Sequence, residues 1–158
     1  DILEQYSNLV VIKSISKSYG VPGLRLGILA TSNAMLMANL RRAVSIWNIN
    51  SFAEFFLQIL GKYERPYQQA MNDFRAERER FVKELQAIEY LRVIPSEANY
   101  LLCEVLPPHT PRELAIQLLK THNILIKDCT SKCHAPYIRI AVRDTNDNNQ
   151  LIAALRTL

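Results

Sequence analysis

The sequence predicts an α/β fold built in two parts, and three observations support this. Short apolar runs of strand length alternate with stretches of helical periodicity along the chain. Residues 66–88 form one amphipathic stretch, long enough for a helix of more than twenty residues. After it, strands and helices alternate as in an α+β domain with helices on one face. We therefore expect one part over residues 1–75 and a small α+β domain over residues 76–158, joined within the long helix.

The part before the long helix is expected to hold two strands and two helices. The first strand is a run rich in valine and isoleucine, typical of a buried strand, and a turn with Gly20, Pro22 and Gly23 separates it from the second. Asparagine residues in capping positions precede both helices. The expected elements are strands over residues 8–12 and 24–30, and helices over residues 34–44 and 52–60.

The long helix should begin near Pro66, which suits a first helical turn. Phe74, Phe81, Leu85 and Ile88 recur on one side of it and should face a core. The domain that follows is expected to contain four short strands and two helices. These are strands over residues 91–94, 99–105, 124–126 and 137–142, and helices over residues 111–121 and 146–158.

Composition excludes several classes of protein. The net charge is +4, but acidic and basic residues alternate, as in residues 75–80, so we do not expect nucleic-acid binding. No apolar stretch approaches the roughly 20 residues of a membrane span. We expect no signal peptide, because the first residues contain no basic region followed by an apolar run. Three cysteines are too few, and odd in number, for a disulfide framework, which favours the cytoplasm. The chain lacks an initiator methionine and is expected to start inside a longer protein.

The most informative stretch is residues 14–27, SISKSYGVPGLRLG. A strand here ends in two hydroxyls and an amine, from Ser14, Ser16 and Lys17, and a tight turn brings the guanidinium of Arg25 back near them. Hydroxyls and a guanidinium suit a phosphate, and a lysine that can lose its proton suits a carbonyl cofactor. The alternative is a strand–turn–strand whose lysine points to water, because surface lysines vastly outnumber catalytic ones.

This stretch resembles the lysine motif of fold-type-I pyridoxal-phosphate (PLP) enzymes of aminotransferase class I/II. That motif reads S/T-x-S-K, five residues, then G-L-R-x-G, and every position matches. The resemblance continues at Arg41-Arg42 and at residues 98–102, 124–126 and 137–143, and favours the branch of histidinol-phosphate aminotransferase and threonine-phosphate decarboxylase. It implies the C-terminal portion of a PLP-dependent transferase fold: the end of the large-domain sheet, a long linking helix and a small α+β domain.

The resemblance also implies a cofactor site. Lys17 should bind pyridoxal 5'-phosphate covalently through an imine, and should later act as the base and acid at the substrate's α-carbon. Ser14, Ser16 and Arg25 should hold the cofactor's phosphate. The family's aspartate beside the pyridine nitrogen precedes the lysine motif and is not in this chain. The chain by itself is therefore expected not to turn over at a useful rate.

For the substrate, the resemblance implies two residues. Arg139 occupies the position at which the family grips the substrate carboxylate, a planar contact that lysine makes poorly. Asn99 should lie near the substrate, although an amide that caps a strand edge explains it equally well. Many aminotransferases of this branch have a glycine at the position of Arg143. Arg143 therefore either adds a second cation near a phosphorylated substrate or is a surface difference.

Two other groups allow competing interpretations. Cys129, Cys133 and His134 invite a zinc site, but a fourth ligand and a standard spacing are missing, so we expect a loop with incidental thiols and no metal. A group of aromatic residues has the spacing of one helix face and is expected to be core or a dimer interface. This group comprises Trp47, Phe52, Phe55 and Phe56.

Three functional hypotheses follow. The leading one is a PLP-dependent aminotransferase that acts on a small amino acid or a phosphorylated amine, as a homodimer without nucleic-acid or membrane partners. The second is a decarboxylase of the threonine-phosphate type on the same scaffold. The third is a non-catalytic dimerisation or regulatory fragment that binds no cofactor.

Overall fold

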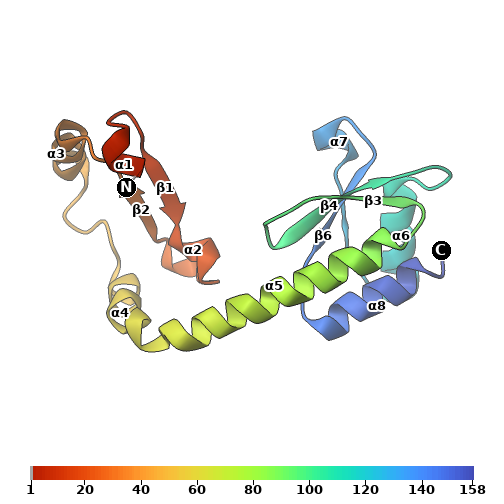
Figure 1. The fold of residues 1–158 in the computed structure, drawn as a ribbon. Helices are drawn as coiled ribbons and strands as arrows, with labels where there is room; N and C mark the ends of the chain where they lie inside the picture. The colour runs from red at the N-terminus through yellow and green to blue at the C-terminus, as the bar shows by residue number, and fades with distance from the viewer. Residues whose placement is uncertain (1) are drawn as a thin grey trace. The chain divides into compact units, whose positions relative to one another are not determined.

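The computed structural model describes residues 2–158, and Asp1 lies outside them (Figure 1). The chain divides into two compact units, here called unit 1 (up to Arg65) and unit 2 (Pro66–Leu158). The division falls near the start of the long helix α5 (Glu64–Gln86). The domain boundary expected between residues 75 and 76 lies further along the same helix and stays a prediction.

Unit 1 is built around one antiparallel hairpin, in which β1 pairs with β2 from Val11 opposite Ala30 to Ser14 opposite Gly27. Both predicted helices are confirmed, and so are their caps. The Asn33 side chain accepts the Leu36 N–H at 2.9 Å, and that of Asn50 accepts the Ala53 N–H at 3.0 Å. In chain order, unit 1 contains α1 (Ile2–Gln5), β1 (Val11–Ser14), α2 (Ile15–Ser18), η1 (Pro22–Leu24), β2 (Gly27–Ala30), α3 (Ala34–Ala43), α4 (Ser51–Leu60) and η2 (Gly61–Tyr63).

The first strand differs from its prediction in position and burial. β1 begins at Val11 rather than at residue 8, and it is exposed throughout, with Ile12 76% exposed. The prediction of a buried strand was wrong, because such a strand needs a layer on each face and this sheet has only two strands among the described residues. The second strand starts late, at Gly27, because Pro22–Leu24 form a 3₁₀ turn.

Unit 2 is an α+β domain, as predicted. Its strands form one antiparallel sheet in the order β3-β4-β6-β5. The long helix is confirmed over 23 residues, with Pro66 in its first turn. Besides most of α5, unit 2 contains β3 (Leu91–Ile94), β4 (Tyr100–Val105), α6 (Pro111–His122), β5 (Lys127–Asp128), α7 (Thr130–Cys133), β6 (Tyr137–Ala141) and α8 (Thr145–Leu155).

The two faces of this sheet have different roles. Alternate residues, such as Ile138 and Ile140 of β6, are fully buried and join one core with side chains of α5, α6 and α8. Figure 1 shows α8 running beside the C-terminal half of α5, where Arg156 of the α8 C-cap pairs with Glu84 at 2.7 Å. The alternating residues on the other face, such as Arg139 and Ala141, are exposed. We call this second face the open face.

One strand begins further along the chain than predicted. Residues 124–126 were expected to be a strand, but the ladder to β6 forms at Lys127 opposite Arg139 and Asp128 opposite Ile138. Leu125 is 79% exposed while Ile126 is buried. The prediction was wrong because an apolar run shows where a chain can be buried, whereas a strand needs a partner edge in register. Across residues 2–158, no helix has both the length and the apolar character that a membrane crossing requires.

Candidate functional site

The lysine motif forms one hairpin at the end of β1, here called the lysine hairpin (residues 14–27). Ser14 ends β1, and Ile15–Ser18 form the single turn of α2. The chain then returns so that the carbonyl of Leu26 accepts the N–H groups of Ile15 (3.1 Å) and Ser16 (3.4 Å). Arg25 is therefore the chain neighbour of Leu26, to which Ser16 is hydrogen-bonded. The backbone brings the four predicted cofactor residues into one hairpin.

The turn of the hairpin depends on two left-handed residues. Gly20 has φ +67° and Arg25 has φ 55°, a conformation that glycine adopts without strain and arginine adopts rarely. Between them, the N–H of Val21 donates to the carbonyl of Ser16 at 2.8 Å. The guanidinium of Arg25 donates to the Pro22 carbonyl at 3.4 Å and is exposed. The left-handed residue thus returns the backbone to β2 and leaves the charged end of Arg25 at the surface.

The hairpin is held from beneath by α4. Ile15 and Leu26 of the hairpin and Ala53 of α4 are the buried residues of a small core. Tyr19 meets Phe56 of α4 edge to face, with ring centroids 6.1 Å apart. The Asn50 side chain also donates to a hairpin carbonyl, that of Leu24, at 3.1 Å. Loosening α4 should therefore loosen the segment that carries Lys17.

Three of the four predicted cofactor residues have exposed side chains, and these fit a phosphorylated aldehyde. Ser14 offers a hydroxyl, Lys17 an amine and Arg25 a guanidinium. Ser16 is different, since it is 5% exposed and its hydroxyl donates to the Leu26 carbonyl at 3.3 Å while accepting the Leu26 N–H at 3.2 Å. A hydroxyl has one proton to donate, so Ser16 binds a phosphate only if it turns away from Leu26.

The two predicted substrate residues line one cavity on the open face of unit 2. Asn99 precedes β4 and Arg139 lies in β6, and the cavity they line has a volume of about 760 Å³. The guanidinium of Arg139 lies over the ring of Tyr100, 5.2 Å from its centroid, a cation–π contact. Lys127 lies directly opposite Arg139 across the β5–β6 ladder and lines the same cavity. Two cations and an amide thus surround one cavity.

One carboxylate also lines this cavity, that of Asp128. It accepts the Thr130 backbone N–H at 2.8 Å, and this bond, with the Thr130 hydroxyl, holds the pKa of the carboxyl below its ordinary value. Within the described residues Asp128 forms no salt bridge with Lys127 or Arg139, although the charge of Lys127 also contributes to the low pKa of Asp128.

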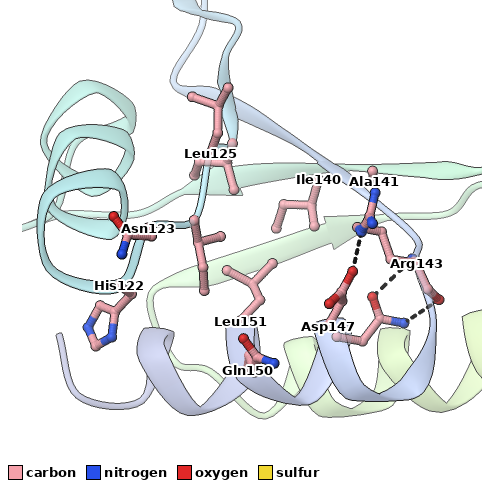
Figure 2. Close-up of a pocket in the computed structure, with 12 residues that line it drawn as sticks. His122, Asn123, Leu125, Ile140, Ala141, Arg143, Asp147, Gln150 and Leu151 are labelled. Carbon is pink, nitrogen blue, oxygen red and sulfur yellow. Dashed lines mark hydrogen bonds and ion pairs between the residues drawn. The ribbon is translucent and has the colours of Figure 1, made fainter.

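Arg143 does not line this cavity. Its guanidinium pairs with Asp147 in the first turn of α8, and this partner raises the pKa of the arginine. Figure 2 shows the pair at the edge of a neighbouring cavity of about 530 Å³, with Gln150 and Leu151 along α8 and His122 at the end of α6. The second cation that lines this cavity beside Arg139 is therefore Lys127, whereas Arg143 lines the neighbouring one.

Lys127 and Tyr100 are the candidates that sequence reasoning missed. Nothing in the sequence shows that Lys127 faces Arg139, because residues 127 and 139 come together only through the register of β5 and β6. Tyr100 had a weak signal, since it follows the candidate Asn99 directly and aromatic rings often stack on arginine. Both residues become visible once the sheet is known.

The aromatic group and the cysteine–histidine group are not part of either cavity described above. Trp47, Phe52 and Phe55 are 92%, 77% and 60% exposed, so the expectation that they belong to the core was wrong, and only Phe56 packs inside unit 1. The alternative, a dimer interface, stays a prediction. Within the described part of the chain, no three histidine, cysteine, aspartate or glutamate side chains gather where they could hold a metal ion.

Known proteins resemble this chain over almost its whole length. Residues 1–155 match the family described as aminotransferase class I and II. The chain is 35% identical over 156 residues to the CMP-5'-(3-aminopropyl)phosphonate synthase of Streptomyces rubellomurinus, covering 97% of this chain and 25% of that protein. It is 34% identical over 160 residues to the threonine-phosphate decarboxylase of Salmonella typhimurium, covering 99% of this chain and 43% of that protein.

A solved structure shows the same arrangement. The histidinol-phosphate aminotransferase from Clostridium acetobutylicum matches with a TM-score of 0.87 and 29% identity, covering 98% of this chain and 47% of that one. The chain thus spans between a quarter and about half of the length of these three relatives. The likeness confirms that the α/β fold predicted here is a portion of a larger enzyme fold.

Proposed function

Because this chain belongs to the aminotransferase class I and II family, we propose that it forms the C-terminal part of a PLP-dependent enzyme whose substrate is an amino acid or amine with a phosphoryl or phosphonyl group. The lysine motif and the exposed amine, hydroxyl and guanidinium of the lysine hairpin support the cofactor. All three relatives named above have a phosphate or phosphonate in their names, which supports the substrate class.

The observation that carries the substrate class is the pair of Lys127 and Arg139. They face each other across the β5–β6 ladder, line one cavity and extend from the open face, where no carboxylate of the described residues forms a salt bridge with either. One cation suffices for a carboxylate, whereas a substrate with both a carboxylate and a phosphate calls for two. A phosphorylated amino acid matches this pair better than an apolar amino acid does.

In unit 1, we assign the roles of the cofactor residues by whether their side chains are exposed or buried. PLP supplies an electron-withdrawing ring that stabilises negative charge at the substrate's α-carbon. The amine of Lys17 binds the cofactor aldehyde and later moves the proton at that carbon. The hydroxyl of Ser14 and the guanidinium of Arg25 donate to the cofactor's phosphate. Ser16, whose hydroxyl is bonded to Leu26, contributes first by holding the hairpin closed.

In unit 2, the proposed roles follow from the cavity. Arg139 donates two parallel N–H bonds to the substrate carboxylate, and the ring of Tyr100 holds the plane of the guanidinium. Lys127 binds the second anionic group as a compact charge. The side-chain amide of Asn99, at the edge of the same cavity, donates to or accepts from the substrate's polar groups.

Transamination is the first reaction that we propose, and decarboxylation is the second. The second is favoured by the 34% identity to the threonine-phosphate decarboxylase over 99% of this chain. The two reactions differ in which bond at the α-carbon is broken, and substrate orientation decides this. We further propose a homodimer in the cytoplasm, and the exposed Trp47, Phe52 and Phe55 support a partner surface.

Absorbance spectroscopy tests the cofactor proposal in the natural protein that contains this chain. Added PLP should produce a near-ultraviolet or visible band from the bond to Lys17, and Lys17→Ala should abolish it. Lys13→Ala is the matched control, because Lys13 is an exposed lysine four residues earlier in β1, and it should leave the band intact. A longer protein without the band would contradict the assignment and favour a non-catalytic role. Absence of the band in the 158-residue chain alone would support only the proposal that this chain is part of a longer enzyme.

Product analysis separates the two reactions. The longer protein is supplied with histidinol phosphate and 2-oxoglutarate, and separately with threonine phosphate. Glutamate formed from the first mixture supports transamination. If threonine phosphate releases carbon dioxide and the mixture with 2-oxoglutarate forms no glutamate, decarboxylation replaces transamination as the proposed reaction.

A further inference from the structure

An arginine of the long helix is buried although it carries a charge. The side chain of Arg78 in α5 is only 9% exposed, whereas most other charged residues of this helix lie at the surface. Charged side chains are seldom buried unless they are paired. Arg78 therefore has a structural task that its neighbour Arg75, exposed and one turn earlier, does not have.

The partners of Arg78 lie in the loop between β3 and β4. Its guanidinium donates to the carbonyl of Ala98 at 3.3 Å and pairs with the carboxylate of Glu97 at 2.5 Å. The Glu97 side chain is 96% exposed, so water screens most of that attraction. The backbone carbonyl of Ala98 is the better anchor, because its bond joins the buried guanidinium to the loop itself.

The same loop is stiffened by its own hydrogen bonds. The hydroxyl of Ser96 accepts the Ala98 N–H at 3.1 Å and donates to the carbonyl of Tyr100 at 2.8 Å. The carbonyl of Asn99 accepts the N–H of Val142 at 3.0 Å. A displacement of Ala98 would therefore move Asn99 and Tyr100 with it.

These two residues are the ones that shape the cavity on the open face. Asn99 and Tyr100 both line it, and the ring of Tyr100 lies beneath the guanidinium of Arg139. We propose that Arg78 is a positioning residue, which fixes the loop before β4 to α5 and thereby sets the position of Asn99, Tyr100 and Arg139 around the bound substrate. Its effect on catalysis rests on the function proposed above, but its effect on the loop does not.

Hydrogen exchange in the longer protein that contains this chain tests the loop directly. In Arg78→Met, which keeps an unbranched stem in the buried site, the amide of Val142 should exchange about 10-fold faster, because its acceptor Asn99 loses its support. The amide of Ile138, which lies in the core, is the internal reference and should not change. Arg78→Lys, which still places a donor near Ala98, should exchange at an intermediate rate. Arg75→Met should resemble the wild type, and equal rates in Arg75→Met and Arg78→Met would refute the proposal.

Kinetics in the longer protein test the consequence for the substrate. Arg78→Met should raise KM for a phosphorylated substrate about 10-fold and change kcat much less, because the substrate's contacts are displaced while Lys17 is untouched. Arg78→Lys should recover part of the loss. Faster exchange with an unchanged KM would show that Arg78 fastens the loop without positioning the substrate, and would overturn the proposal. A wild-type protein without the absorbance band would instead contradict the proposed function, and the exchange result would still decide the role of Arg78 in the loop.

Discussion

At the scale of single residues, neighbours in one strand have opposite tasks. Ile138 and Ile140 are buried in the core, whereas Arg139 between them reaches the cavity on the open face. Lys127 has the same orientation as Arg139 because the two are ladder partners. A change at residue 127 or 139 should therefore alter binding without weakening the core.

Lys127→Gln should discriminate between substrates in the longer protein. Because the loss of a charge-assisted hydrogen bond costs about 1.5–3 kcal/mol, KM for a phosphorylated substrate should rise about 10-fold or more, and KM for the unphosphorylated analogue should change little. Lys120→Gln, at an exposed site of α6, serves as the control. Equal effects on the two substrates would remove Lys127 from phosphate recognition.

The three cysteines should differ in their reactivity toward alkylating reagents. Burial raises the pKa of the Cys103 thiol to about 12, so at pH 8 almost none of it is the reactive thiolate. Cys129 is also buried, whereas Cys133 is exposed. Mass spectrometry after iodoacetamide treatment should find only Cys133 modified in the folded chain and all three modified in urea. Rapid modification of Cys103 in the folded chain would contradict its position in the core.

The predicted candidate residues divide according to the kind of signal behind them. Lys17, Ser14 and Arg25 could be selected because a short motif with fixed spacing carries them, and all three lie in one hairpin. The contact of Ser16 with Leu26 could not be predicted, since it depends on how tightly the turn closes. Lys127 was missed because cross-strand neighbours are set by sheet register, which periodicity alone does not specify.

At the scale of elements, local signals predicted the helices better than the strands. Asn33, Asn50 and Pro66 mark helix starts by chemistry that acts within one turn, and all three helices form there. The strand expected at residues 124–126 instead pairs at Lys127–Asp128. Its position depends on the register with β6, which lies further along the chain and is not a local signal. The apolar run at residues 8–12 likewise does not show whether another layer of the fold packs on the strand, and β1 is in fact exposed.

One carboxylate of α5 accepts several hydrogen bonds, two of them from α8. Glu77 of α5 accepts hydrogen bonds from Arg80, from Asn148 of α8 and from Thr145 of α8. These bonds, that from Arg80 above all, lower the pKa of Glu77 to about 2. A carboxyl with a lower pKa in the folded state stabilises the fold above its unfolded pKa, and this stability is lost as the pH falls from about 4.5 to about 2.

Glu77→Gln should therefore lower the free energy of unfolding at pH 7 by about 1–2 kcal/mol. The difference from the wild type should shrink as the pH approaches 2, where the wild-type carboxyl is itself half protonated. Urea denaturation at several pH values measures this. Glu79→Gln, an exposed position of the same helix, should have a small effect at every pH, and a difference from the wild type that persists at pH 2 would contradict the assignment.

Asn50 has two separable roles in unit 1. Its carbonyl oxygen caps α4 by accepting the Ala53 N–H, and its amide donates to Leu24 of the lysine hairpin. Asn50→Asp should keep the cap and lose the tie to Leu24, whereas Asn50→Ala should lose both and cost about 1 kcal/mol more. Amide exchange in α4 should then rise only in Asn50→Ala, while exchange in the hairpin should rise in both. Equal exchange in α4 for the two variants would show that the cap is not what stabilises the helix.

At the scale of the whole molecule, the two units differ in how much they bury. Among the described residues, the core of unit 1 consists of Ile15, Leu26 and Ala53, whereas unit 2 buries residues from three helices and its sheet in one large cluster. Because stability follows buried apolar area, unit 1 should open more readily than unit 2. Residues 44–50, all exposed, connect two helices of the weaker unit.

Limited digestion of the 158-residue chain by chymotrypsin should show this difference. In the monomeric chain the first cut is expected after Trp47, which is 92% exposed in the segment between α3 and α4. A fragment that contains Pro66–Leu158 should persist, and mass spectrometry identifies it. A first cut within β4 or β6 would mean that unit 2 is the weaker part.

The open face of unit 2 also affects how such an enzyme can change its preference during evolution. Along β6, the side chains that reach the cavity alternate with those that build the core, so a change in one set need not alter the other. A lineage could exchange Lys127 or Tyr100 for a residue suited to another metabolite while Leu101 and Ile138 kept the domain folded. A one-sided sheet thus gives selection a surface on which new specificities can be tried at little risk to folding.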